Sequence, residues 1–379
     1  MKRAGEGKRV DVMVVVGTRP EAIKMAPIIR DFQARSNECH LNVVNTAQHR
    51  ELVDQALSIF DLRADIDLDL MEENQSLSRL FSRGVDAFEK VLVRHQPDVL
   101  LVEGDTSTVF LTSLLAFYNK VEIAHVEAGL RTSDLYDPFP EEANRRITSV
   151  ITNIHFAPTS WAKANLIREG YPEDKIYVTG NPVVDAFLHA LKLKPDTDYE
   201  TLTDIEADTS RMILVTAHRR ENHGQPLESI CEAIGQLHDQ HKDLSFVYPV
   251  HPNPQVKNIV QRLLSDKPRV RLVPPLDYVS FVHLMNRSYL ILTDSGGIQE
   301  EAPSISKPTL ILRKTTERPE ALDAGTAKVV GTETKNIVQE VTSLVSDERK
   351  YNSMVGRENP FGDGNAAKRI VDITIERYG

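Results

Sequence analysis

Carboxylates, cations and small residues form clusters that each follow an apolar, β-branched run. Ligands of open parallel sheets bind beyond the carboxyl ends of the strands, so this shared placement predicts a binding region. Loops after strands are polar in most proteins, but here small residues accompany the charges in both halves. The clusters are Gly17-Thr18-Arg19-Pro20-Glu21, Glu103-Gly104-Asp105-Thr106, Glu127-Ala128-Gly129-Leu130-Arg131, Ala217-His218-Arg219-Arg220-Glu221, His251-Pro252-Asn253 and Asp294-Ser295-Gly296-Gly297.

Three carboxylates are candidates for acid–base chemistry. Asp105 and Glu127 each follow a run that has the pattern of a buried strand, and Glu141 lies in a segment rich in proline and aromatic residues before a helix. Each alone is more commonly a helix cap or an ion-pair partner. Together they can supply an acid and a base, provided that their surroundings separate their pKa values. His218 opens a dense cationic cluster and suits donation to a phosphate, although a single histidine is often structural.

The segment from Asp294 to Glu301 predicts a strand end, a glycine pair and a helix start. Such a turn presents backbone N–H groups and the positive end of the helix dipole to an anion. The alternative is an ordinary helix start capped by Ser295. Arg19 and Lys24 add positive charge after the first predicted strand, which favours contact with an anion there.

Several classes of protein are disfavoured. No glycine fingerprint of a dinucleotide-binding turn occurs in a suitable context, so we expect no NAD-type cofactor. The histidines are too scattered for zinc, and we expect no metal. Cys39 and Cys231 support no disulfide framework. The net charge of −10 argues against nucleic acid and anionic membranes as partners. The run Val12–Val16 is too short for a signal peptide, and no stretch is long enough to span a membrane, so we expect a cytoplasmic protein.

Apolar runs alternate with helical stretches along the whole chain, which predicts parallel sheets covered on both faces. At 379 residues the chain suits two domains. We expect two Rossmann-like, doubly wound α/β domains facing a central cleft, with residues 1–181 in the first domain and 182–364 in the second. The expected strands are Val10–Val16, Leu41–Thr46, Val99–Val102, Ile123–Val126, Ile154–Ala157, Ile176–Thr179, Met212–Thr216, Ser245–Val250, Val270–Val273, Tyr289–Leu292, Thr309–Leu312 and Lys328–Val330.

Motifs along almost the whole chain resemble those of the non-hydrolysing UDP-N-acetylglucosamine 2-epimerases of bacteria. They occur in the order typical of the family. The matching stretches are GTRPEAIKMAP (17–27), TAQHRE (46–51), GDT (104–106), HVEAGLRT (125–132), PEEANR (140–145), TGN (179–181), TAHRREN (216–222), YPVHPNP (248–254), LTDSGGIQEEAP (292–303), TTERPEA (315–321), AGT (324–326) and NPFGDGNA (359–366).

This resemblance implies a GT-B type fold, a homodimer, a UDP-sugar substrate, a role in cell-surface polysaccharide synthesis, and return of the C-terminal helix 365–379 to the first domain. It implies that Asp105, Glu127 and Glu141 are catalytic. His218 is expected at the nucleotide or its phosphates and is included with the catalytic set. The other expected contacts to the nucleotide or its phosphates are Arg19, Lys24, Ser295, Gly296, Gly297 and Arg318, with Phe281 by the uracil and Glu301 at the ribose hydroxyls.

The chain departs from the family pattern at three positions. Glu103 stands where members often have His, which puts an extra carboxylate beside Asp105; if buried, it would raise a neighbour's pKa. Gln48, Arg219 and His251 match a regulatory site at which some members bind a second UDP-GlcNAc as activator. Glu51 and Asn74 replace a Gln and an Arg that are found in at least some regulated members, so the resemblance leaves this regulation open.

The missing dinucleotide fingerprint favours elimination over oxidation as the route to inversion at C2. Expulsion of UDP from C1 would acidify the C2 proton, a carboxylate would remove it to give 2-acetamidoglucal, and UDP would add back after protonation on the opposite face. The sequence leaves open which carboxylate is the base. Four alternatives remain: a glycosyltransferase with the same fold, a hydrolysing epimerase, an epimerase for a related UDP-sugar such as a uronic acid, and a non-catalytic sensor.

Overall fold

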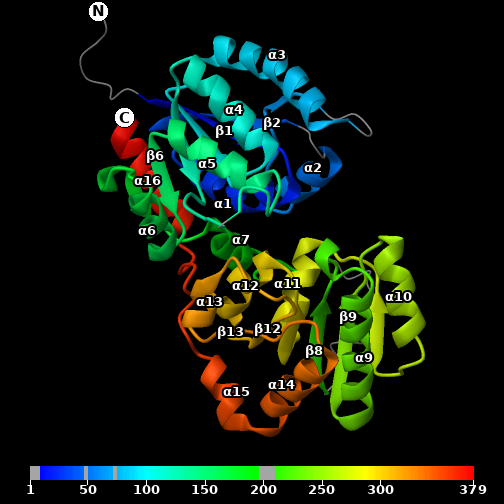
Figure 1. The fold of residues 1–379 in the computed structure, drawn as a ribbon. Coiled ribbons are helices and arrows are strands. Elements are labelled where there is room, and N and C mark those ends of the chain that lie inside the picture. The colour runs from blue at the N-terminus through cyan, green and yellow to red at the C-terminus, as the bar shows by residue number, and fades with distance from the viewer. Residues whose placement is uncertain (1–8, 47–49, 71–74, 133, 196–209) are drawn as a thin grey trace, which may run out of the picture. The chain divides into compact units, whose positions relative to one another are not determined.

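The computed structural model describes residues 9–46, 50–70, 75–132, 134–195 and 210–379, and it divides into two compact units. The first unit comprises residues 1–186 and 361–379, and the second comprises residues 187–360. Figure 1 labels the helices and strands of both units. Among the described residues, no helix is long and apolar enough to cross a membrane.

The first unit is built on a parallel sheet with strand order β3-β2-β1-β4-β5-β6-β7. The order reverses direction between β1 and β4, which is the switch point at which doubly wound sheets bind ligands. The strands are β1 (Val10–Val16), β2 (Cys39–Asn45), β3 (Ile66–Asp67), β4 (Val99–Glu103), β5 (Glu122–Val126), β6 (Ile154–Ala157) and β7 (Ile176–Val178). The helices are α1 (Arg19–Ala34), α2 (Arg50–Ser58), α3 (Leu77–His95), α4 (Ser107–Tyr118), α5 (Glu141–Ile151), α6 (Ser160–Arg168), α7 (Pro182–Ala190) and α16 (Ala366–Tyr378), with a 3₁₀ turn at Glu173–Lys175.

The second unit repeats this plan with strand order β10-β9-β8-β11-β12-β13, again parallel throughout. Its strands are β8 (Arg211–Thr216), β9 (Leu244–Pro249), β10 (Val270–Val273), β11 (Leu290–Thr293), β12 (Thr309–Ile311) and β13 (Ala327–Val329). Its helices are α9 (Gln225–Gln240), α10 (Pro254–Leu264), α11 (Tyr278–Arg287), α12 (Gly296–Glu301), α13 (Pro319–Asp323), α14 (Thr334–Ser346) and α15 (Glu348–Met354), with 3₁₀ turns at Arg220–Asn222 and Ala302–Ile305. The predicted α/β class with two Rossmann-like domains is confirmed.

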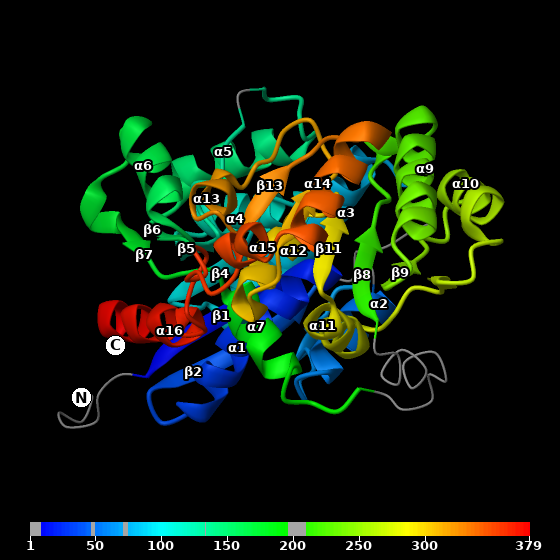
Figure 2. The same cartoon turned by 90° about the horizontal axis from the view of Figure 1, so that it is seen from below.

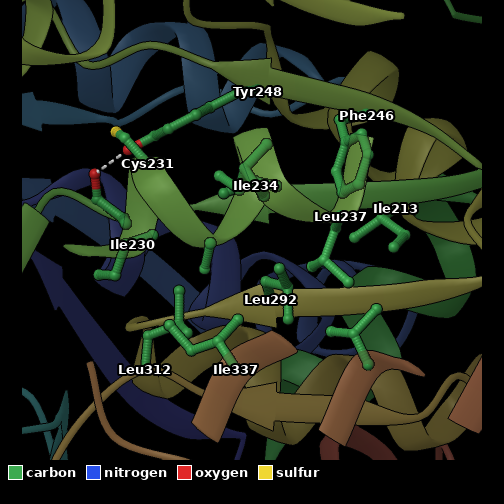
Figure 3. Packing of buried hydrophobic residues seen from close by; sticks show 14 of the residues in the cluster. Ile213, Ile230, Cys231, Ile234, Leu237, Phe246, Tyr248, Leu292, Leu312 and Ile337 are labelled. Carbon is green, nitrogen blue, oxygen red and sulfur yellow. Dashed lines mark hydrogen bonds between the residues drawn. The ribbon is translucent and has the colours of Figure 1, made fainter. Parts of the chain in front are cut away.

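The core of the second unit carries one polar contact that reaches its ligand edge. Figure 3 shows Tyr248 packed among aliphatic side chains and Cys231, and a dashed line marks the hydrogen bond of its hydroxyl group. The hydroxyl donates to the Ala217 carbonyl oxygen at 2.6 Å. Because a buried hydroxyl needs a partner, this contact fixes the backbone directly before His218.

The C-terminal helix α16 belongs to the first unit, where it packs beside α1 (Figure 2). The α16 N-cap residue makes no capping contact through its own side chain, and Asp185 of α7 takes its place. The Asp185 carboxylate accepts from the N–H groups of Ala366 (3.2 Å) and Ala367 (3.0 Å). The sequence-based boundary after Asn181 therefore lies five residues before that of the structure, because the first turn of α7 is bound to the first unit.

The predicted strands agree with the observed ones to within two residues at each end, but one strand was missed. β3 pairs only two residues, Ile66 and Asp67, with the end of β2. A two-residue edge strand that carries an exposed aspartate has no run long enough to reveal an alternating pattern. Glu141, expected in a loop, is instead the first residue of α5.

Candidate functional site

The carboxyl edge of the first sheet brings together charged residues from α1, β4 and the loop after β5. Lys24 of α1 reaches this edge, and its Nζ lies 2.9 Å from Glu103 Oε1 and 2.5 Å from Glu127 Oε2. Asn181 Nδ2 also donates to Glu127 Oε2, at 2.7 Å. Glu103 and Glu127 are both buried, so the two carboxylates share one ammonium group away from bulk water.

Glu127 has a left-handed backbone, with φ at 61°. A non-glycine residue in this region costs about 1–2 kcal/mol. The hydrogen bond from Ala128 N to Phe156 O, 3.1 Å, ties this turn to the neighbouring strand. Strain held by surrounding structure is typical of functional positions, and it is consistent with the expected role of Glu127.

Asp105 is held by a different cation. Arg145 of α5 pairs with its carboxylate, and Asn144 Nδ2 donates to the Asp105 backbone oxygen at 2.9 Å. Arg145 Nη1 also lies 3.2 Å from Glu142 Oε2. Asp105 is therefore bound to a guanidinium group, whereas Glu127 is bound to an ammonium group that it shares with Glu103. Such unequal surroundings are what a paired acid and base require.

The structure places Glu141 and Arg19 at the starts of α5 and α1, both half-buried. Neither side chain makes an ion pair or hydrogen bond within the described residues. α5 is the helix whose next turn holds Asp105, so Glu141 starts the same helix that orients one catalytic candidate. Gln48 and Asn74 lie outside the described residues.

A carboxylate that the sequence reasoning did not select, Glu21, anchors the turn between β1 and α1. Its Oε2 accepts from the N–H groups of Gly17 (2.6 Å) and Thr18 (3.0 Å), and Thr106 Oγ1 donates to Oε1 at 2.5 Å. Burial raises the pKa of Glu21 to about 7, against the opposing effect of these hydrogen bonds. The Thr-x-x-Glu spacing of a capping box was the available signal.

The second sheet carries a cationic site around Gly296. A Cβ atom at Gly296 would lie 3.4 Å from Arg318 Cζ and 3.7 Å from Arg219 Nη2, so two guanidinium groups flank the start of α12. Arg318 is oriented by Glu300, whose Oε1 accepts from its Nε at 2.8 Å. The Ser295 side chain makes no capping hydrogen bond, unlike the capped helix start considered from sequence. Two guanidiniums beside a glycine backbone suit a phosphate group.

Asp294 organises the adjoining turn. It is fully buried, and its Oδ2 accepts from the backbone N–H groups of His218 (2.8 Å) and Arg219 (2.8 Å) and from Asn222 Nδ2 (3.0 Å). His218 Nδ1 lies 3.9 Å from Asp294 Oδ1. Burial lowers the pKa of His218, and Asp294 opposes that effect. His218 is thereby held beside Asp294, two residues before Gly296.

Two residues expected at a regulatory site adjoin residues expected at the substrate site. The His251 ring stacks on His218, with 5.3 Å between centroids, and Arg219 lies by Gly296. Phe281 lies half-buried on α11, and Glu301, buried on α12, accepts from Tyr278 Oη at 2.9 Å. No three His, Cys, Asp or Glu side chains gather to hold a metal ion within the described ranges.

Comparisons with known proteins agree with this architecture. A UDP-N-acetylglucosamine 2-epimerase from Neisseria meningitidis is 50% identical over 369 residues, covering 96% of this chain and 99% of its own. A crystal structure of UDP-GlcNAc 2-epimerase from the same species, bound to UDP-GlcNAc, aligns with TM-score 0.89 and 49% identity, covering 97% of this chain and 100% of its own.

A more distant relative retains the same fold. The UDP-GlcNAc 2-epimerase of Methanocaldococcus jannaschii, in complex with UDP-GlcNAc and UDP, aligns with TM-score 0.82 and 33% identity, covering 97% of this chain and 100% of its own. The family model described as UDP-N-acetylglucosamine 2-epimerase matches residues 32–375. The chain therefore belongs to the UDP-N-acetylglucosamine 2-epimerase family.

Proposed function

We propose that this chain inverts C2 of UDP-N-acetylglucosamine to give UDP-N-acetylmannosamine, reversibly and without hydrolysis. One observation carries the mechanism: Asp105 and Glu127 follow neighbouring strands β4 and β5 and are bound to different cations, Arg145 and Lys24. Two carboxylates in unequal surroundings can take a proton from a carbon and return one. The names of the relatives supply the substrate class.

The reaction begins when the C1–O bond to UDP breaks and positive charge develops on the sugar. This charge acidifies the C2 proton, a carboxylate accepts it, and a C1=C2 double bond forms in 2-acetamidoglucal. Protonation at the other face of C2 and re-addition of UDP to C1 complete the inversion. Arg219, Arg318 and His218, around Gly296, are the groups that would stabilise the departing diphosphate.

Proton NMR of UDP-GlcNAc incubated with the pure protein in D₂O tests the proposal. We expect UDP-ManNAc that carries deuterium at C2. Retention of the original hydrogen through many turnovers would exclude this mechanism. Free N-acetylmannosamine with UDP would indicate a hydrolysing enzyme, and an unchanged substrate would favour a glycosyltransferase that awaits an acceptor.

Activation by a second UDP-sugar at Arg219 and His251, the homodimer and the cytoplasmic location stay predictions. The complex of the M. jannaschii relative contains both UDP-GlcNAc and UDP. In this chain the two candidate regulatory residues adjoin His218 and Gly296. That proximity supports direct communication between an activator and the diphosphate-binding groups.

A further inference from the structure

Glu103 is the last residue of β4, and it lies opposite Val126, the residue directly before Glu127, in the register of β4 and β5. The two carboxylates thus lie at the same edge of the sheet, one at the end of β4 and the other directly after β5. Glu103 is 2% exposed and Glu127 is 7% exposed. Lys24 Nζ contacts both of them, at 2.9 and 2.5 Å. Glu103, noted as a departure from the family pattern, therefore belongs to the same cluster as a catalytic candidate.

The charge balance of this cluster determines its protonation. With Lys24 charged and both carboxylates ionised, the three side chains carry a net negative charge in a buried place, which low polarity disfavours. One proton on the carboxylate pair makes the three side chains neutral overall. Burial raises the pKa of Glu103 well above its ordinary value, Lys24 opposes this, and Glu127 adds to it.

Other titratable groups also surround Glu103. Glu21 lies one helical turn before Lys24 on α1, and its pKa near 7 leaves it largely uncharged in mildly acidic solution. Asp105, two residues beyond Glu103, is paired with Arg145. His125 of β5 binds the Gly104 carbonyl oxygen at 2.7 Å, and burial lowers its pKa to about 4, so it is neutral near pH 7. Lys24 is the cation that contacts Glu103 directly.

We propose that Glu103 is a positioning residue of the reaction, which shares one proton with Glu127 across the Lys24 ammonium and so holds Glu127 as an oriented carboxylate beside a neutral neighbour. The proton resides on Glu103 when Glu127 is ionised and on Glu127 when Glu103 is ionised, so its exchange between the two carboxylates needs no further reactant, and the pair loses this proton only at higher pH. Interacting carboxylates of this kind titrate as a pair. This inference rests on the proposed epimerase function.

Glu103→Gln tests the proposal, because glutamine has the size of glutamate and keeps an oxygen for Lys24 but holds no exchangeable acid proton. Since the variant cannot lose a proton at position 103, we expect the alkaline limb of the pH profile of kcat/KM to move to higher pH by about one unit or more, a tenfold change in rate on that limb. KM should stay within about twofold, since Glu103 binds no substrate. Glu103→Asp restores an acid group, and its profile should regain the limb with a lower kcat.

Glu89→Gln is the matched control, because it makes the same substitution on the exposed face of α3 in the same unit. Its profile should superimpose on that of the unmodified chain. A Glu103→Gln profile that also superimposes would overturn the proposal. Unfolding of either variant is monitored by the fluorescence of the single tryptophan, Trp161.

A second measurement does not depend on turnover or on a stable glutamine variant. Carbon NMR of the full chain, with glutamate side-chain carboxyls labelled, should show a carboxyl that titrates well above pH 4.5 and vanishes in Glu103→Asp. Glu21 supplies another such signal, which must persist in that variant. The proposal is contradicted if the signal that is lost in Glu103→Asp titrates near pH 4.5 in the unmodified chain. Failure of the unmodified chain to exchange C2 hydrogen would refute the proposed function while leaving this titration intact.

Discussion

Replacing Glu21 by Gln should remove a loss of stability that the first unit suffers as the pH rises from 4.5 to about 7. Glu21 is buried, and the environment raises its pKa from 4.5 to about 7 because burial disfavours the charged form. Between these two values the folded state binds the proton more tightly than the unfolded chain. The free energy of unfolding therefore falls as pH rises through this window.

The magnitude follows from the two pKa values. One pKa unit corresponds to about 1.4 kcal/mol, so the carboxylate of Glu21 lowers the free energy of unfolding by about 3 kcal/mol at pH 8 relative to pH 4. Between pH 5 and pH 8 the change is about 2.5 kcal/mol. Glutamine carries no such ionisation. Its different hydrogen bonds with Gly17, Thr18 and Thr106 add a constant offset, which cancels when only the pH dependence is compared.

Trp161 makes the measurement specific to the first unit, since it is the only tryptophan in the chain and lies in α6. Urea unfolding followed by its fluorescence, at pH 5, 6.5 and 8, gives the free energy for the unmodified chain and for Glu21→Gln. The difference between the two should grow in favour of the variant as pH rises. Equal pH dependence in both proteins would refute the assignment of a raised pKa to Glu21, and Glu89→Gln serves as the control for lost charge.

Three further predictions concern one residue of the first unit and two residues of the second unit. Asp105→Asn should lower kcat about 10²–10⁴-fold, and near-normal turnover would remove Asp105 from the mechanism. Arg318→Lys loses the planar group that Glu300 orients, so calorimetry should find UDP bound about tenfold more weakly; unchanged affinity would place the diphosphate elsewhere. Tyr248→Phe leaves the Ala217 oxygen without its donor and should cost about 1–3 kcal/mol in urea unfolding of the second unit, followed by circular dichroism; an unchanged midpoint would contradict this.

Local sequence predicted the strands and the position of the ligand edge. Runs such as Val10–Val16 and Ile154–Ala157 contain enough apolar, β-branched residues to mark buried parallel strands, and their ends matched the structure. Polar clusters after these runs lie at the carboxyl ends of strands because chain direction alone fixes that end. The short strand Ile66–Asp67 escaped detection, since two residues carry no periodic signal.

The sequence by itself determined which side chains stand at the ends of the strands, including Asp105, Glu127 and the unusual Glu103. Only the tertiary structure decided which of them meet. Lys24 lies 79 residues from Glu103 and 103 from Glu127, and Arg145 lies 40 residues from Asp105. Such contacts depend on the order of strands in the sheet and on the packing of helices against it. Local patterns carry no information about that order, so the charges that surround each carboxylate emerge only when the sheet has assembled.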